Sequence, residues 1–144
     1  MLGQRIAVSQ RDEIASMRRW LASRGEYAPS VDSAGVHVHG AHGAEAAPMV
    51  HDATHQDMPG MIGSEDLARL AAETGDAFDR LFLELMIRHH DGALVMVRTL
   101  FATVGAAQES ELFDIASEVD ADQRAEIERM RAMLRTLTGG AQGR

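Results

Sequence analysis

Cysteine is absent from this chain of 144 residues. Its absence excludes disulfide bonds, thiolate metal sites and cysteine nucleophiles. Aromatic residues make up only 4% of the chain, so a hydrophobic core must be built from Ala, Leu, Ile, Val and Met. A core of these residues favours helices over sheets. At this length we expect one domain with a core of its own.

Several classes of protein are excluded by what the charge pattern and the motifs lack. The formal net charge is −8, with no basic stripe, so nucleic-acid binding is not expected. No run of about 18 apolar residues occurs, so no membrane span is predicted. The N-terminus, MLGQRIAVSQRDE, lacks the apolar segment of a secretory signal. Because no Walker or Rossmann loop and no redox motif is present, we expect no nucleotide, haem or flavin.

The spacing of apolar residues predicts an all-α fold. It repeats with helical periodicity in four segments, and no segment alternates as a strand would. Glycines and N-cap residues mark the ends of these segments. We expect an antiparallel helical bundle with helices over residues 5–24, 64–74, 77–103 and 108–137.

One internal repeat is visible. SQRDEIASMRRWL (9–21) matches DQRAEIERMRAML (122–134), with seven identical residues at a constant offset. We interpret the two segments as copies of one helical unit, the first without an upstream histidine helix. The chain then divides into a helix equivalent to the end of a preceding repeat, a His- and Met-containing linker, a helical repeat with the His-His motif and a flexible tail, at residues 1–25, 26–63, 64–138 and 139–144.

Two adjacent histidines, His89 and His90, lie inside the third predicted helix, in LMIRHHDGA. Imidazole is costly to bury without a partner, so the pair needs an explanation. Helical geometry places both within a broad apolar face, with His89 nearer its middle and His90 nearer its flank. Met86 lies one turn earlier, so its sulfur can approach either imidazole.

A turn at Gly105 would fold this helix against the last one. The two histidines then lie within a turn of Gln123 and Glu126, and Asp79 lies near methionines in the next layer. Imidazole with thioether suits copper(I) and silver(I), whereas imidazole with carboxylate suits copper(II) or zinc. We therefore predict a metal site, for copper or silver before zinc, with donors from His89, His90, Met86, Met96, Gln123, Glu126, Met130 and Asp79.

The alternative is a structural role, in which a carboxylate holds the histidine pair in the core and no metal binds. Di-iron chemistry is disfavoured because no Glu has a His three residues later. A zinc protease is disfavoured because the HExxH motif is absent. The linker is a second candidate, because short His-rich tracts bind metal by composition. The alternative for the linker is a solvated loop that binds no metal. The secondary donors there are His37, His39, His42, His51, His55, Met58 and Met61.

The segments AFDRLFLELMIRHHDGALVMV and ADQRAEIERMRAML, with MPGM at 58–61, resemble the bacterial domain of unknown function family 305. The resemblance covers residues 58–138, and residues 5–24 resemble the tail of a preceding copy. It implies a ferritin-like bundle exported to the periplasm or beyond, and some relatives bind copper. The expected function is soft-metal binding for sequestration or tolerance, with metal ions as partners and catalysis less favoured.

The oligomeric state is a further expectation. The histidine helix is apolar over most of its circumference, so it needs neighbours on more than one side. The place of a second histidine helix is open in this chain. An isologous homodimer would cover it and could bring two histidine pairs together.

Overall fold

The computed structural model describes residues 2–28, 30–31, 37–38 and 58–140. Its four α-helices are α1 (Leu2–Ser23), α3 (Ser64–Ala72), α4 (Gly75–Ala102) and α5 (Ser110–Gly140). The all-α prediction is confirmed, and each predicted helix end lies within three residues of the observed one. A two-residue ladder of β1 (Ser30–Val31) and β2 (His37–Val38), paired antiparallel, was not expected. No helix of the described residues could cross a membrane.

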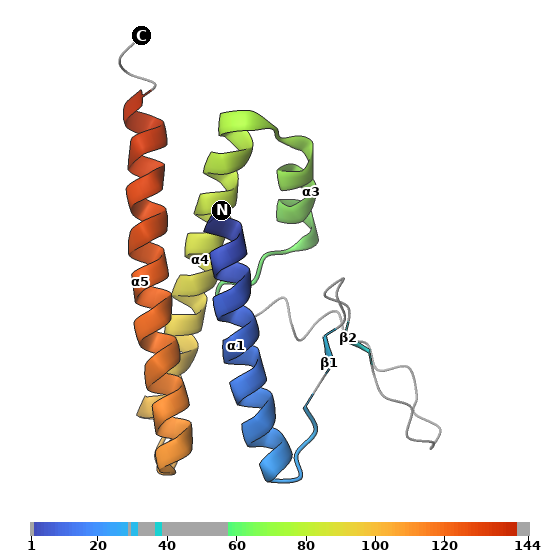
Figure 1. Cartoon of the computed structure of the whole chain (residues 1–144), viewed down its shortest axis with the longest axis vertical. Coiled ribbons are helices and arrows are strands. Elements are labelled where there is room, and N and C mark those ends of the chain that lie inside the picture. Colours follow the sequence, from blue (N-terminus) through green and yellow to red (C-terminus); the bar gives the residue numbers. More distant parts are fainter. Residues whose placement is uncertain (1, 29, 32–36, 39–57, 141–144) are drawn as a thin grey trace.

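The three long helices form the bundle (Figure 1). α4 and α5 are an antiparallel hairpin, and the turn between them contains Gly105, whose φ of +83° favours glycine. α1 packs beside α5 and runs in the same direction as α4. α3 lies against α4. Within the described residues α1 and α4 make no close backbone contact, so one side of the bundle is open.

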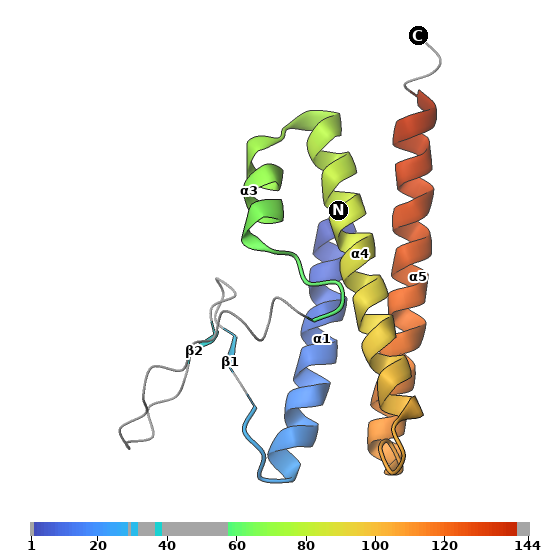
Figure 2. The same ribbon diagram turned by 180° about the vertical axis from the view of Figure 1, so that it is seen from behind.

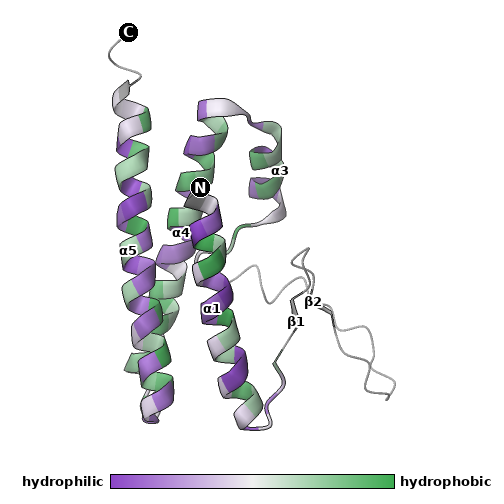
Figure 3. Ribbon diagram, viewed as in Figure 1, coloured by the Kyte–Doolittle hydropathy of each residue, from purple (hydrophilic) through white to green (hydrophobic). Residues whose placement is uncertain are grey.

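The hydrophobic core lies where α1, α4 and α5 meet. Hydrophilic and hydrophobic residues are interspersed along the helices (Figure 3), as in helices that bury one side and expose the other. The buried cluster joins one residue of α1 to two of α4 and two of α5: Ile6, Leu83, Leu94, Ile127 and Met130. Burial of such side chains is worth about 1.5–3 kcal/mol each, so the burial of Ile6 in this cluster helps to hold α1 onto the hairpin.

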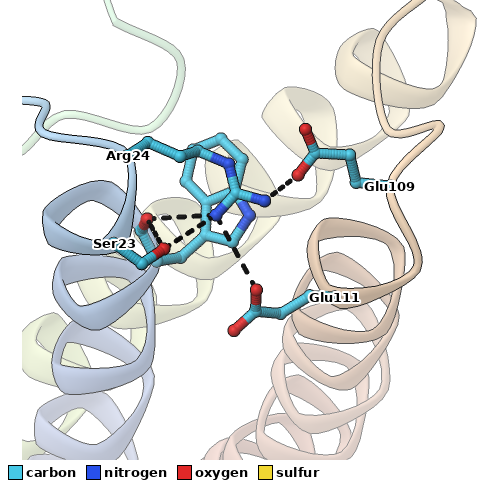
Figure 4. Close-up of polar contacts among 5 residues, drawn as sticks. Ser23, Arg24, Glu109 and Glu111 are labelled. Atoms are coloured by element: carbon cyan, nitrogen blue, oxygen red, sulfur yellow. Dashed lines mark hydrogen bonds and ion pairs between the residues drawn. The ribbon is translucent and has the colours of Figure 1, made fainter.

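Arg24 fixes the lower end of α1 to the start of α5 (Figure 4). Its guanidinium lies over the Trp20 ring, with Cζ 4.1 Å from the ring centroid. It pairs with the carboxylates of Glu109 and Glu111, the latter at 3.7 Å, and also donates to the hydroxyl of Ser23. Because these pairs connect two helices far apart in sequence, they help to set the position of α1 at this end.

Candidate functional site

His90 is fully buried and is bonded across the hairpin. Its Nε2 lies 2.7 Å from Oε2 of Glu126, which is buried as well. The expected proximity of these two residues is therefore observed. A carboxylate accepts, so the imidazole donates from Nε2. Nδ1, the other ring nitrogen, has no partner among the residues that the structure describes.

The hydrogen bond to Glu126 occupies Nε2 and leaves the buried Nδ1 as the ring nitrogen without a partner among the described residues. A neutral imidazole whose N–H is held by a carboxylate, with a lone pair on the other nitrogen, is the form in which histidine binds metal.

His89 is held in the opposite tautomer and points elsewhere. Its Nδ1 lies 3.2 Å from the carbonyl oxygen of Gly60, which can only accept, so the proton is on Nδ1 and the lone pair on Nε2. The side chain is half-buried and lines a groove. His89 lies on the apolar face as predicted from the sequence, but His90, nearer the flank of that face, is the more buried of the two. α5 covers the His90 side of that broad face, whereas no described helix covers the His89 side.

Two glycines bring the MPGM segment against the histidine helix. Gly60 has φ +75°, and a Cβ there would lie 2.8 Å from Cα of Gly92. A Cβ on Gly92 would lie 2.1 Å from the carbonyl oxygen of Pro59. Both contacts are with backbone, which cannot easily move aside. The segment can therefore reach His89 only because both positions lack a side chain.

Gln123 contacts α1 instead of the histidines. It is buried, and its Nε2 lies 3.1 Å from each carboxylate oxygen of Glu13. Sequence reasoning missed Glu13, although the internal repeat equates it with Glu126 and could have identified it. The polar layer of the bundle therefore contains two glutamates, each held by a side chain of a neighbouring helix.

The remaining predicted donors fall into separate places. Met130 is fully buried, and Met86 packs against the same core cluster. Met96 is 41% exposed and lines the groove with His89. Asp79 is exposed and lines another cavity, of about 510 Å³, with Met133. The structure thus brings His90, Met86 and Met130 to the core and leaves Asp79 apart from both histidines.

The linker donors are mostly beyond what the structure describes. Met58 is exposed and Met61 half-buried in the MPGM segment, and His37 belongs to β2. Among described residues, no group of three or more His, Asp or Glu side chains is placed to hold a metal ion. A metal ion bound among the described residues would therefore need thioether or amide donors as well. Four predicted donors lie outside the described residues: His39, His42, His51 and His55.

Burial raises the pKa of the Glu13 carboxyl above its ordinary value of 4.5. The nearby carboxylates of Glu126 and Asp122 raise this pKa further, while the bond from Gln123 and the neighbouring His90 oppose the rise. The folded state therefore holds the Glu13 proton more tightly than the unfolded chain does. The stability that this proton gives is present below pH 4.5 and is lost as pH rises through the folded pKa.

Glu13→Gln is expected to raise the Tm at neutral pH by about 2 °C or more, because the desolvated charge is removed while an acceptor for Gln123 is kept. The gain should shrink as the pH falls through the raised pKa of Glu13, because the protonated carboxyl is neutral like the glutamine amide. Thermal unfolding followed by circular dichroism at several pH values measures it. Glu128→Gln, at an exposed position, controls for the loss of one negative charge. An equal gain in both variants, or a pH-independent one, contradicts the assignment.

The fold and the site define a small helical bundle with a buried histidine–glutamate pair, and they define no reaction. The chain belongs to the family described as domain of unknown function DUF305, whose model matches residues 1–134. It is also similar to the crystal structure of a DUF305 fragment from Deinococcus radiodurans, with 27% identity and a TM-score of 0.66. That match covers 92% of this chain and 72% of the other. No curated protein matches the chain.

Proposed function

We propose that this protein binds a soft metal ion, copper(I) or silver(I), through Nδ1 of His90 and the sulfurs of Met86 and Met130. The observation that carries the proposal is the bonding of the two ring nitrogens of His90. Its Nε2 proton is held by Glu126, and its buried Nδ1 has no partner among the described residues. The proposed role is metal sequestration or tolerance in the cell envelope.

The positions of the two methionines support this donor set. Met86 precedes His90 by one helical turn, so both side chains are on the same side of α4. Met130 follows Glu126 by one turn on α5 and belongs to the core cluster against which Met86 packs. An imidazole with two thioethers is a soft donor set, which favours a monovalent copper or silver ion over zinc.

Glu126 would act on the metal through His90. A carboxylate that accepts the imidazole N–H fixes the ring orientation and makes the opposite nitrogen a better donor, and losing such a partner costs roughly tenfold to a hundredfold in affinity. Protons compete with metal for imidazole, so binding should weaken at acid pH. The envelope location rests on the family resemblance, and fractionation of cells that make the full-length protein tests it.

Silver(I) titration of a chain labelled at its methionine methyl groups tests the donor set. The first equivalent should shift the NMR signals of Met86 and Met130 before those of the exposed Met58. Met86→Leu and Met130→Leu keep the apolar volume, so the fold should survive, and each should weaken silver affinity about tenfold or more. The measurement is isothermal titration, repeated with copper(I) in the absence of oxygen.

Met58→Leu is the matched control, since it removes one exposed thioether and leaves the core unchanged. If the first equivalent shifted other methionines and left Met86 and Met130 unchanged, the proposed site would be wrong. The histidine–glutamate pair would then be a structural feature of the core.

A further inference from the structure

The two copies of the internal repeat differ in how they are packed. Glu126, Ile127 and Met130 of α5 correspond to Glu13, Ile14 and Met17 of α1. On α5 these three residues face α4 and are 4%, 2% and 0% exposed. On α1, Ile14 is 38% exposed and Met17 is 42% exposed, and Glu13 is only half-buried. The same side-chain pattern is thus covered by a helix in one copy, whereas no helix of the described residues covers it in the other.

The uncovered residues line a groove on the open side of the bundle. Figure 2 shows α1 and α4 diverging toward their lower ends, and a groove of about 420 Å³ lies there. From α1 it is lined by Glu13, Ile14 and Met17, and from α4 by a stripe that includes His89 and Met96. Its lining is mostly apolar, with polar groups concentrated around Glu13.

We propose that this groove is the docking site of an additional helix with the pattern of α4, in which an apolar stripe packs on Ile14 and Met17 and a histidine donates to Glu13. The template is within the chain. α4 packs on α5 through this pattern, with the imidazole of His90 donating to Glu126. The proposal concerns a different face of the bundle from the His90 metal site and does not depend on it.

The charges around Glu13 favour a docked helix that carries a histidine. Gln123 donates to its carboxylate, but none of the residues that line the groove is an arginine. The carboxylates of Glu126 and Asp122 lie nearby and add negative charge. The amide of Gln123 is a neutral donor, so a further N–H donor would stabilise this carboxylate, and a helix with a histidine at this level supplies one together with apolar cover.

The probe is a synthetic peptide with the sequence of residues 76–102, added unlabelled to the full chain labelled at its methionine methyl groups. We expect saturable shifts of Met17 and Met96, and little change at Met86 and Met130. A dissociation constant of roughly 1–100 μM is expected, because an isolated helix must fold as it binds. The peptide variant His90→Ala should bind about tenfold more weakly, whereas the peptide variant His89→Ala should bind like the parent.

A double-mutant cycle tests the direct pair. Glu13→Gln in the chain should weaken the parent peptide about tenfold, yet it should hardly change binding of the His90→Ala peptide, because the two changes remove one interaction. Circular dichroism confirms that the chain variant is folded. The peptide variants leave the chain untouched, so their comparison stands even if the chain variant unfolds.

The results of these experiments show whether a helix of this pattern binds in the groove and whether a second copy of the chain supplies it. If the chain alone forms dimers that the peptide dissociates, with Met17 and Met96 at the interface, a second copy supplies the helix and the proposal is supported. Dimers that the peptide does not dissociate, equal affinity of the His90→Ala peptide, or no saturable shift at about 100 μM peptide would overturn it. None of these results concerns silver binding at Met86 and Met130, so the two proposals can fail separately.

Discussion

Replacing Glu126 with alanine is expected to lower the free energy of unfolding by about 2–4 kcal/mol. Both side chains of the His90–Glu126 pair are buried, and their 2.7 Å bond crosses from α4 to α5. Removing the carboxylate leaves the Nε2–H of His90 buried without its acceptor and opens space in the core. For a chain of this size the Tm should fall by roughly 10 °C, which thermal and urea unfolding can measure.

Two variants separate the bond from other effects of losing a glutamate. Glu126→Gln keeps an acceptor oxygen of the same shape, so it should cost less than about 1 kcal/mol. Glu128→Ala, at an exposed position two residues later, should change stability by no more than about 0.5 kcal/mol. If alanine and glutamine at position 126 were equally destabilising, the hydrogen bond would not explain the effect. If alanine were neutral, His90 would have to find another acceptor.

The helix boundaries were predictable because the signals that set them are local. Gly25, with φ +72°, follows the end of α1, and Gly105 occupies the turn of the hairpin. Both positions need a left-handed backbone that glycine adopts without strain, so the sequence marks them directly. The β1–β2 ladder was not predictable in this way, since two-residue strands carry too few residues for an alternating pattern.

The proximity of His90 to Glu126 was predictable only to within about a turn. Antiparallel helices have equal rise per residue, so counting from the turn at Gly105 gives the approximate level of each residue, but it does not choose between Gln123 and Glu126 as the partner of His90. The burial of the two histidines was not predictable, because a broad apolar face does not reveal which of its parts will be covered. That depends on where α5 packs and on the absence of a described helix over His89.

The partners of His89 and Gln123 could not be read from the histidine helix alone. His89 bonds to the carbonyl of Gly60, a backbone group that carries no sequence signal of its own. Gln123 bonds to Glu13, which lies 110 residues away in the chain. A usable clue was Gly92, because a glycine inside a helix is unfavourable unless another segment passes close to it.

Gly92→Ala should therefore detach the MPGM segment from α4 while α4 stays helical. Alanine favours the helix by about 1 kcal/mol, but its Cβ would lie 2.1 Å from the carbonyl oxygen of Pro59. The segment must move away, and it loses the packing of the half-buried Met61 and Ile62. Because partial burial of two such side chains outweighs the helical gain, we expect a net loss of about 1–2 kcal/mol in the free energy of unfolding.

The local effect of Gly92→Ala should exceed this global one. The Met61 amide bonds to the carbonyl of Met58 at 3.1 Å, and its hydrogen exchange should become roughly tenfold faster or more. His89 should lose its fixed tautomer, which the nitrogen chemical shifts of the ring report. Gly3→Ala is the matched control: it is also helical, nothing lies within 4 Å of its added Cβ, and it should stabilise slightly. If Gly92→Ala behaved like Gly3→Ala, with Met61 still protected, the close contact between the two glycines would not be what holds the segment on the histidine helix.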